Sequence, residues 1–203
     1  MHNLSFDSNI FTEAVAEHLT VVQALTQDGG LLEQIARHMT AALLEGKKVV
    51  WCGNGGSAAD AQHLAAELVG RFRRERSALA SIALSTNTSI LTAIGNDYGY
   101  EHVFRRQVEA LCSKGDVVVG ISTSGNSPNV CLALEAARER GCKTVAFTGR
   151  EGGKAAQIAD VALRVPSTET PRIQEAHILC GHIICDWIEL NISRQEPART
   201  ALA

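Results

Sequence analysis

Two features of the stretch 49–71 could carry out chemistry: a glycine-rich turn and a histidine–glutamate pair. The turn covers residues 53–57, with sequence Gly-Asn-Gly-Gly-Ser, and follows an apolar run that predicts a buried strand over 49–52. A helix over 58–69, capped by Ser57, is expected after the turn. A strand, a glycine-rich turn and a helix N-terminus in succession form an anion site. The turn's backbone N–H groups are unpaired, and the helix dipole favours negative charge.

His63 and Glu67 stand four residues apart on the predicted helix and therefore share one of its faces. This spacing occurs in solvated ion pairs as well as in metal and catalytic sites, so the pair alone does not decide between them. The turn before the pair is not a P-loop, since no Gly-Lys-Ser/Thr follows it. It is not the dinucleotide fingerprint either, since Ala58 occupies the place of the third glycine.

A second loop of the same kind covers residues 122–127, with sequence Ser-Thr-Ser-Gly-Asn-Ser. It follows the β-branched run 116–121, which predicts a central buried strand, and it precedes a helix that begins at Pro128. A plain connection with Ser127 as N-cap would explain that serine but not the other hydroxyl groups around it. Two hydroxyl-rich loops at one edge of a sheet predict a phosphorylated small molecule as the ligand.

The last predicted helix carries two histidines and a glutamine among apolar residues. Of these, His177 is expected to be a satisfied core residue. Four side chains could form a metal site of nitrogen and oxygen donors, a set that suits zinc although glutamine is a less usual ligand: His63, Glu67, Gln174 and His182. Gln174 and His182 are eight residues apart, about 12 Å along a regular helix. Either the helix is irregular near Gln174, or one ligand comes from a neighbouring subunit.

Composition places the chain among ordinary globular proteins. Its 203 residues suffice for one domain with a real core, and 45% of them are apolar against 20% charged. With a net charge of −3 and no long basic cluster, nucleic acid is not an expected partner. No apolar run approaches the roughly 20 residues that span a bilayer, and no signal-peptide pattern is present, so no membrane contact is expected. The six cysteines form no Cys-x-x-Cys pair and lie mostly in apolar segments, which indicates reduced thiols in a cytoplasmic protein rather than zinc ligands.

Strands and helices alternate from residue 48 onward, which predicts right-handed crossovers and a mostly parallel sheet covered on both faces. The predicted strands are 49–52, 78–84, 116–121, 143–147 and 161–165. The predicted helices are 9–25, 31–44, 58–69, 101–111, 128–140 and 171–192, with a short helical or irregular piece at 87–94. The two helices before the sheet, separated by Gly29 and Gly30, are expected to pack against another subunit. We expect one domain over 1–193, including N-terminal helices over about 9–45, and a frayed tail over 194–203.

Five spaced motifs resemble the phosphoheptose isomerases of the sugar-isomerase (SIS) superfamily over nearly the whole chain. They are Cys-Gly-Asn-Gly-Gly-Ser at 52–57, Gly-Asn-Asp at 95–97, Ile-Ser-Thr-Ser-Gly-Asn-Ser at 121–127, Phe-Thr-Gly at 147–149 and Arg-Ile-Gln-Glu at 172–175. The resemblance implies a flavodoxin-like three-layer αβα sandwich with a mostly parallel sheet of about five strands. It also implies a homotetramer with active sites at subunit interfaces. The activity it implies is conversion of sedoheptulose 7-phosphate to D-glycero-D-manno-heptose 7-phosphate, the first step of heptose synthesis for the lipopolysaccharide core.

The resemblance also implies one zinc ion per subunit, held by His63, Glu67, Gln174 and His182. Aldose–ketose exchange moves a proton between C1 and C2 through an enediol, which needs a base at carbon and an acid near the two oxygens. Glu67 and His182 are the available catalytic pair. The candidates for contact with the substrate are Asn54, Gly55, Gly56, Ser57, Glu67, Arg71, Asn96, Asp97, Ser122, Thr123, Ser124, Ser127 and Gln174.

The same scaffold also serves a non-catalytic relative, an adaptor that binds the replication initiator DnaA. That relative resembles this chain but lacks the carboxylate at the place of Glu67 and the histidine at the place of His182. Because this chain keeps both, the enzyme is favoured over the adaptor. In one departure from some isomerases, Pro171 replaces an acid just before the Arg-Ile-Gln-Glu motif, so a proton relay through that position is not expected to carry over.

Overall fold

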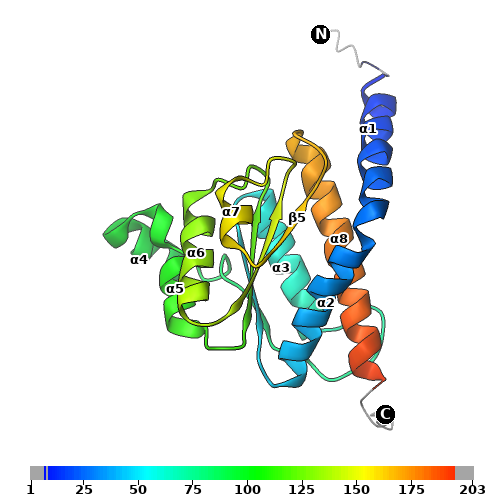
Figure 1. Cartoon of the computed structure of the whole chain (residues 1–203). Helices are drawn as coiled ribbons and strands as arrows, with labels where there is room; N and C mark the ends of the chain where they lie inside the picture. The colour runs from blue at the N-terminus through cyan, green and yellow to red at the C-terminus, as the bar shows by residue number, and fades with distance from the viewer. Residues whose placement is uncertain (1–6, 8, 195–203) are drawn as a thin grey trace, which may run out of the picture.

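Five parallel strands form a central sheet in the order β2-β1-β3-β4-β5, with helices on both faces (Figure 1). The structure is a computed structural model that describes residues 7 and 9–194. The strands are β1 (Val49–Gly53), β2 (Ser81–Ala83), β3 (Val117–Ser122), β4 (Lys143–Thr148) and β5 (Val161–Arg164). The α-helices are α1 (Asn9–Leu25), α2 (Gly29–Leu44), α3 (Gly56–Val69), α4 (Thr88–Tyr98), α5 (Arg105–Leu111), α6 (Pro128–Glu139), α7 (Gly153–Ile158) and α8 (Thr170–Ser193), with 3-10 turns at Thr26–Asp28 and Tyr100–His102. This strand order is that of flavodoxin-like sheets and confirms the predicted fold.

The central strands of the sheet are buried on both faces. Every residue of β1 and β3 is buried, and their side chains alternate between two apolar clusters. Trp51 and Val119 belong to the cluster formed with α2, α3 and α8, whereas Val50 and Val118 belong to the cluster formed with α5 and α6. A strand buried on both faces needs a continuous apolar run, which explains why the sequence predicts these strands well.

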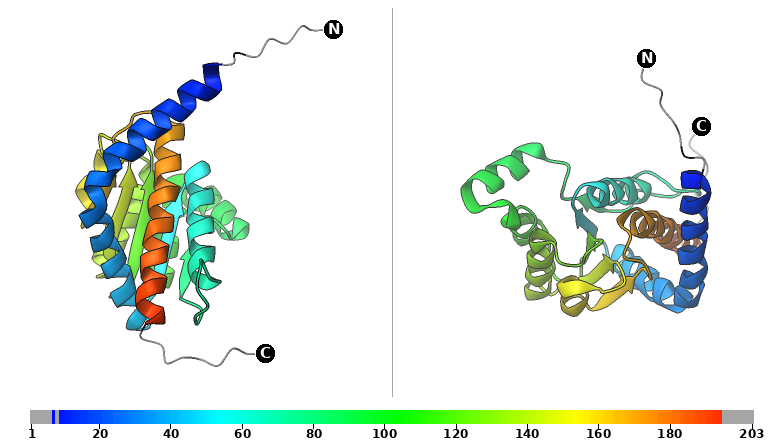
Figure 2. Two further views of the ribbon diagram at one scale, coloured as in Figure 1. Left: turned by 90° about the vertical axis from the view of Figure 1, so that its right-hand side faces the viewer. Right: turned by 90° about the horizontal axis from the view of Figure 1, so that it is seen from above.

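Helices α3 and α8 lie side by side on one face of the sheet (Figure 2). A Cβ atom at Gly181 on α8 would lie 2.6 Å from Leu64 Cδ1 on α3, so a larger residue fits there only if the Leu64 side chain shifts. Nearer the N-terminus of α3, a Cβ atom at Gly56 would lie 2.5 Å from Gln174 Nε2. Glycine at these two positions lets the helices approach until polar side chains on their facing sides can contact each other.

Helix α1 extends beyond the rest of the molecule in Figure 1 and in the left view of Figure 2. The guanidinium of Arg172 on α8 donates a hydrogen bond to the carbonyl oxygen of Ala14 at 2.6 Å, which ties the helix to the body. Two of its apolar side chains are nevertheless solvent-exposed, with 77% of Phe11 and 60% of Leu19 accessible. Helix α1 therefore carries an apolar face that the described part of this chain does not cover.

Several predicted boundaries were wrong. The break between the first two helices is the 3-10 turn at Thr26–Asp28, and Gly29 and Gly30 lie inside the first turn of α2. The predicted strand 78–84 forms only the three residues of β2, which lies at an edge of the sheet and pairs with β1 alone. Helix α4 continues through Gly95, Asn96 and Asp97, which were predicted to follow a helical or irregular piece.

Helix α3 begins one residue before the predicted cap. Gly55 occupies the N-cap position with φ 56° and ψ −122°, a conformation open to glycine, while Ser57 is buried inside the first turn. No helix was predicted over the six residues of α7, because so short a helix shows no hydrophobic period. The predicted frayed tail, 194–203, lies outside the described residues except for Arg194. Among the described residues, no helix is both long and apolar enough to cross a membrane.

Candidate active site

The two predicted anion loops begin at neighbouring strand ends. β1 and β3 pair in parallel, with Gly53 opposite Ile121, so the turn after β1 and the loop after β3 leave the same edge of the sheet. This is the point at which the strand order reverses, where ligands bind in open parallel sheets. The sheet topology thus brings together the two segments that were singled out as phosphate-binding.

A pair of asparagines links the two loops. Asn54 Nδ2 donates to Asn129 Oδ1 at 2.9 Å, and Asn129 Nδ2 donates to Asn54 Oδ1 at 2.8 Å. Asn129 is buried in the first turn of α6, and its Oδ1 also accepts from the backbone N–H of Val130 at 3.0 Å. The Tyr100 hydroxyl lies 3.5 Å from Asn54 Oδ1. Sequence reasoning missed Asn129, although an amide in the first turn after the second loop was a usable signal.

The hydroxyl groups of the second loop differ in how far they are free to bind a ligand. Ser122 is buried, and its Oγ shares a hydrogen bond of 2.9 Å with Ser127 Oγ, so Ser127 does not cap α6 through its side chain. Ser124 is exposed, and its Oγ accepts from the backbone N–H of Asn126 at 3.2 Å. The backbone is fixed as well, because the carbonyl of Thr123 accepts from Gly149 N at 2.9 Å. Hydrogen bonds therefore hold the backbone at Thr123 and Ser124 in place.

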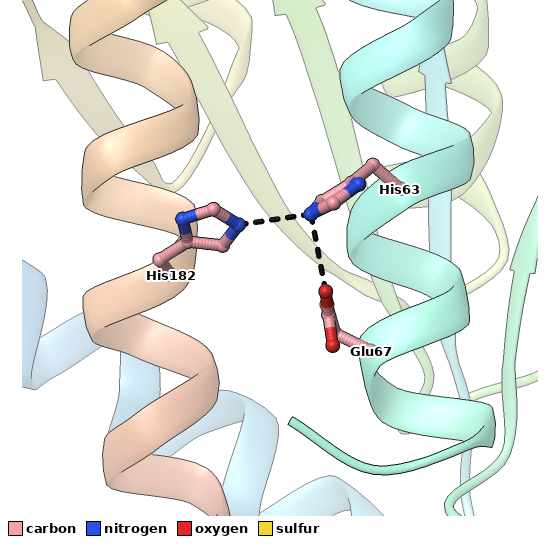
Figure 3. A group of neighbouring side chains, drawn as sticks. All are labelled: His63, Glu67 and His182. Atoms are coloured by element: carbon pink, nitrogen blue, oxygen red, sulfur yellow. Dashed lines mark hydrogen bonds and ion pairs between the residues drawn. The ribbon is translucent and has the colours of Figure 1, made fainter. Parts of the chain in front are cut away.

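Three of the four proposed metal ligands come together between α3 and α8 (Figure 3). His63 Nε2 lies 2.9 Å from His182 Nε2 and 3.1 Å from Glu67 Oε1. The ligand atoms of the three residues all lie within 4.8 Å of one another. Two imidazole nitrogens and a carboxylate that converge on one point fit the donor set of a zinc-type ion. The same three side chains could also hold and move a proton.

Gln174 lies apart from this cluster. Helix α8 is continuous from Thr170 to Ser193, so the irregular helix considered from the sequence is not observed. The side-chain amide of Gln174 instead lies against Gly56, at the glycine-rich turn. His182 is two turns further along α8, at the level of His63 on α3. Within this one chain, Gln174 therefore belongs with the turn rather than with the histidines.

The remaining substrate candidates are exposed. Arg71 lies beyond the end of α3, where its Nε is 3.8 Å from a Glu75 carboxylate oxygen. On α4, Asn96 Nδ2 donates to Asp97 Oδ1 at 2.7 Å. Helix α4 projects from the body on the side away from α8 (Figures 1 and 2). The described contacts do not join these three residues to the His63 cluster.

Burial and neighbouring charge tune the acid–base groups of the site. Burial first, and then the nearby His63, lower the pKa of His182, while Glu67 acts in the opposite sense. His182 is therefore neutral at pH 7 and able to accept a proton. One turn before His63, burial raises the pKa of Asp60 to about 6, and its Oδ2 has no hydrogen-bond partner among the described residues. Asp60 was not predicted; a carboxylate three residues before His63 was the available signal.

His177 is a buried core residue, as expected, but it is only partly satisfied, because its Nδ1 has no hydrogen-bond partner among the described residues. Its side chain is fully buried, it packs beside Phe147, and its Nε2 lies 3.1 Å from the carbonyl oxygen of Thr148. Burial lowers the pKa of His177 to about 4, against the smaller opposing effect of the Thr148 carbonyl. His177 is therefore neutral and takes no part in the cluster of His63, Glu67 and His182.

Comparison with known proteins gives consistent matches. A family model described as the SIS domain matches residues 11–149. The phosphoheptose isomerase of Aliarcobacter butzleri is 55% identical over 186 residues, which cover 92% of this chain and 98% of that protein. The phosphoheptose isomerase of Pelobacter propionicus is 61% identical over 159 residues, which cover 78% of this chain and 84% of that protein.

Solved structures agree with these matches. The structure of phosphoheptose isomerase GmhA from Neisseria gonorrhoeae superimposes with a TM-score of 0.85 at 49% sequence identity, covering 90% of this chain and 98% of that chain. A phosphoheptose isomerase from Francisella tularensis gives a TM-score of 0.83 at 37% identity, covering 90% of this chain and 95% of that chain. Sequence and fold therefore point to the same group of proteins.

Acid is expected to destabilise the fold through His177. The folded pKa of about 4 lies below the ordinary 6.5, so the unfolded chain binds the proton more readily between these values. The stability that neutral His177 supplies is present above pH 6.5 and is lost as the pH falls to about 4, by up to roughly 3 kcal/mol. Urea unfolding at a series of pH values should give a flatter dependence for His177→Gln than for the parent. Parallel curves for the two proteins would contradict this assignment.

Proposed function

This chain belongs to the phosphoheptose isomerase family of SIS-domain proteins, and we propose that it converts sedoheptulose 7-phosphate to D-glycero-D-manno-heptose 7-phosphate. The reaction is the first step of heptose synthesis for the lipopolysaccharide core. The observation that carries the proposal is the meeting of Glu67 and His182, from two different helices, in one cluster of side chains. Both residues are at the positions where the DnaA-binding adaptor lacks such groups.

The spacing of the site suits a long sugar phosphate. Gly56 opens α3 beside the anion turn, and His63 is seven residues further along the same helix, about 10 Å away. A seven-carbon sugar carries its phosphate at one end and its reacting carbonyl at the other. Phosphate at the two loops would therefore place C1 and C2 of the extended sugar near the His63, Glu67 and His182 side chains.

Glu67 and His182 divide the proton transfers in this proposal. The Glu67 carboxylate takes a proton from C1 of the ketose while His182 gives one to O2, which yields the enediol. Glu67 then returns a proton to C2 while His182 takes the proton from O1, which yields the aldose. The lowered pKa of His182 supports this role, because a neutral imidazole can donate from one ring nitrogen and accept at the other.

We also propose one zinc ion per subunit, held by His63, Glu67 and His182, whose donor set fits such an ion. The Glu67 contact would be displaceable, which leaves its carboxylate free to act as the base. When bound, zinc would polarise the substrate carbonyl and stabilise the negative charge on its oxygen. Because α8 is regular and the Gln174 amide lies at the turn, a Gln174 ligand for this ion would come from a neighbouring subunit. Within its own chain, Gln174 is placed to contact the substrate near the turn.

The exposed apolar face of α1 supports a homotetramer. Phe11, Val15 and Leu19 recur at steps of four, share a face of the helix and are all exposed. A groove lined in part by Leu44 and Trp187 lies between α2 and α8. A second copy of the chain could cover both surfaces and complete the site.

We place this homotetramer in the cytoplasm as a one-domain subunit. All six cysteines are free and buried, as expected of thiols kept reduced. Buried side chains of α2 join the same apolar cluster as those of α3 and α8, so the N-terminal helices share the core of the sheet. No feature of the described surface indicates nucleic acid or membrane as a partner.

Replacement of the proton-transfer residues tests the mechanism. Glu67→Gln and His182→Asn should each lower turnover of sedoheptulose 7-phosphate by at least the ~10²-fold typical of a general acid or base. Glu109→Gln, which removes a carboxylate from α5 on the other face of the sheet, is the matched control and should keep the parent rate. Metal analysis beside the kinetics separates loss of zinc from loss of the proton-transfer group. Parent turnover in both site variants, or a parent that binds DnaA without turnover, would remove the isomerase mechanism.

Substitutions in the second loop test the phosphate site. Thr123→Val and Ser124→Ala should each remove one hydrogen bond to the charged phosphate, worth roughly 1.5–3 kcal/mol, and so weaken substrate affinity roughly 10- to 150-fold. Ser113→Ala, before β3 at the opposite edge of the sheet, is the control and should bind normally. Calorimetric titration with the sugar phosphate measures all three. Unchanged affinity in both loop variants would place the phosphate elsewhere.

Sedimentation velocity tests the assembly. The parent should sediment at about four times the chain mass of 21.7 kDa at micromolar concentration. Phe11→Asp combined with Leu19→Asp should dissociate it, because the apolar face of α1 would then carry charge that is costly to bury. Ala24→Asp adds charge to another exposed face of the same helix and should leave the tetramer intact. A monomeric parent would refute the assembly.

A further inference from the structure

The imidazole of His182 contacts two other rings. The Phe72 ring stacks on it with a centroid distance of 5.2 Å and an interplanar angle of 23°. The His63 ring is tilted against it, with centroids 5.1 Å apart and an angle of 57°. Phe72 is not part of α3 or α8; it lies in the segment 70–77, within the connection from α3 to β2. Phe72, a residue from an irregular segment, therefore covers one face of the His182 ring, the proposed proton-transfer group.

A buried carboxylate holds this segment in place. Glu189 on α8 is fully buried and accepts hydrogen bonds from the backbone N–H groups of Phe72, Arg73 and Arg74 at 2.6, 2.8 and 2.9 Å. Burial alone would raise the pKa of Glu189, but these three N–H groups and Arg76 outweigh it and leave the pKa below its usual value. Glu189 is therefore ionised and fixes the backbone at Phe72.

Arg76, the counter-ion of Glu189, also contacts the backbone of Glu67, the other proposed proton-transfer residue. The fully buried Arg76 guanidinium lies 3.2 Å from the Glu189 carboxylate. It also donates to the backbone carbonyl oxygens of Glu67 at 2.7 Å and of Gly70 at 3.0 Å. One buried ion pair thus anchors the last turn of α3, where Glu67 lies, and the segment that carries Phe72.

The anchors on α8 lie in register with His182. Asp186 and Glu189 follow His182 by four and seven residues, so the three side chains share one face of the helix. Asp186 pairs with Arg73 at 3.2 Å and also with Arg74. The segment 70–77 is therefore held along the same face of α8 that presents His182.

We propose that Phe72 is a positioning residue, whose stacked ring fixes the orientation of the His182 imidazole for the proton transfers. This inference rests on the proposed function, because it assigns His182 a reacting role. The torsion that rotates a histidine ring is broad, so the side chain alone does not define the direction of Nε2. A small misplacement of a reacting group costs rate without a matching loss of binding. Phe72 itself contacts the imidazole rather than the substrate.

Two substitutions of Phe72 separate ring stacking from simple apolar packing. Phe72→Leu keeps an apolar side chain but removes the ring, and it should lower kcat roughly tenfold with KM unchanged. Phe72→Tyr keeps the ring and should retain the parent kcat. Leu31→Val is the matched control, because Leu31 also packs half-buried on the same apolar cluster but does not touch His182. It should keep the parent kcat.

Nuclear magnetic resonance of histidine-labelled protein gives a readout that does not depend on activity. The stacked Phe72 ring should shift the His182 ring protons upfield; the shift should be lost in Phe72→Leu and kept in Phe72→Tyr, with His182→Asn identifying the signal. Parent kcat in Phe72→Leu, or an equal loss in Leu31→Val, would overturn the positioning role. An active parent without the upfield shift would overturn it as well. A parent that shows the shift but has no isomerase activity would instead refute the proposed function, and with it the reacting role of His182.

Discussion

The close approach of α3 and α8 is the constraint on which the candidate site depends. Gly181 sits where any Cβ would collide with Leu64, and the next residue along α8 is His182, which reaches His63 across the same contact. A larger residue at 181 would have to displace the Leu64 side chain, which packs between the helices beside the 2.9 Å contact of the two histidine nitrogens. Packing density and chemistry are therefore coupled here, because the same glycine that tightens the core brings the reacting groups together.

Buried charged side chains hold the irregular segments near the site in place. Glu189 and Arg76 are both removed from solvent, yet they pair with each other and each has several hydrogen-bond partners, which offset part of the cost of desolvating them. Just before β3, Asp116 accepts from the backbone N–H groups of Lys48 and Ser113 in the same way. In both places a carboxylate collects the free backbone donors of a segment without regular structure. Such segments then hold one conformation without a strand or helix of their own.

The Arg-Ile-Gln-Glu motif serves three parts of the fold at once. Ile173 is buried in the apolar core, and Gln174 lies against the glycine-rich turn. Arg172 and Glu175 turn the other way and hold α1, with Glu175 Oε2 2.8 Å from His18 Nδ1. One turn of helix thus connects the proposed substrate site with the helix whose apolar face is proposed to bind another subunit. Arg172 and Glu175, which hold α1, and Gln174, which lies at the glycine-rich turn, are thus neighbours in the same turn of α8.

The sequence by itself determined the layered fold and the two loops, because buried parallel strands are continuous apolar runs and the turns after them need glycine and hydroxyl residues. It also placed His63 and Glu67 on one face, since four residues make about one helical turn. His182, 119 residues from His63, was grouped with them from residue type and family resemblance. Only the tertiary structure decided that Gln174 lies at the turn instead, and that Phe72 and Asn129 make contacts no local pattern marks. Sequence periodicity reports on neighbours within one element, whereas these contacts arise from how separate elements pack.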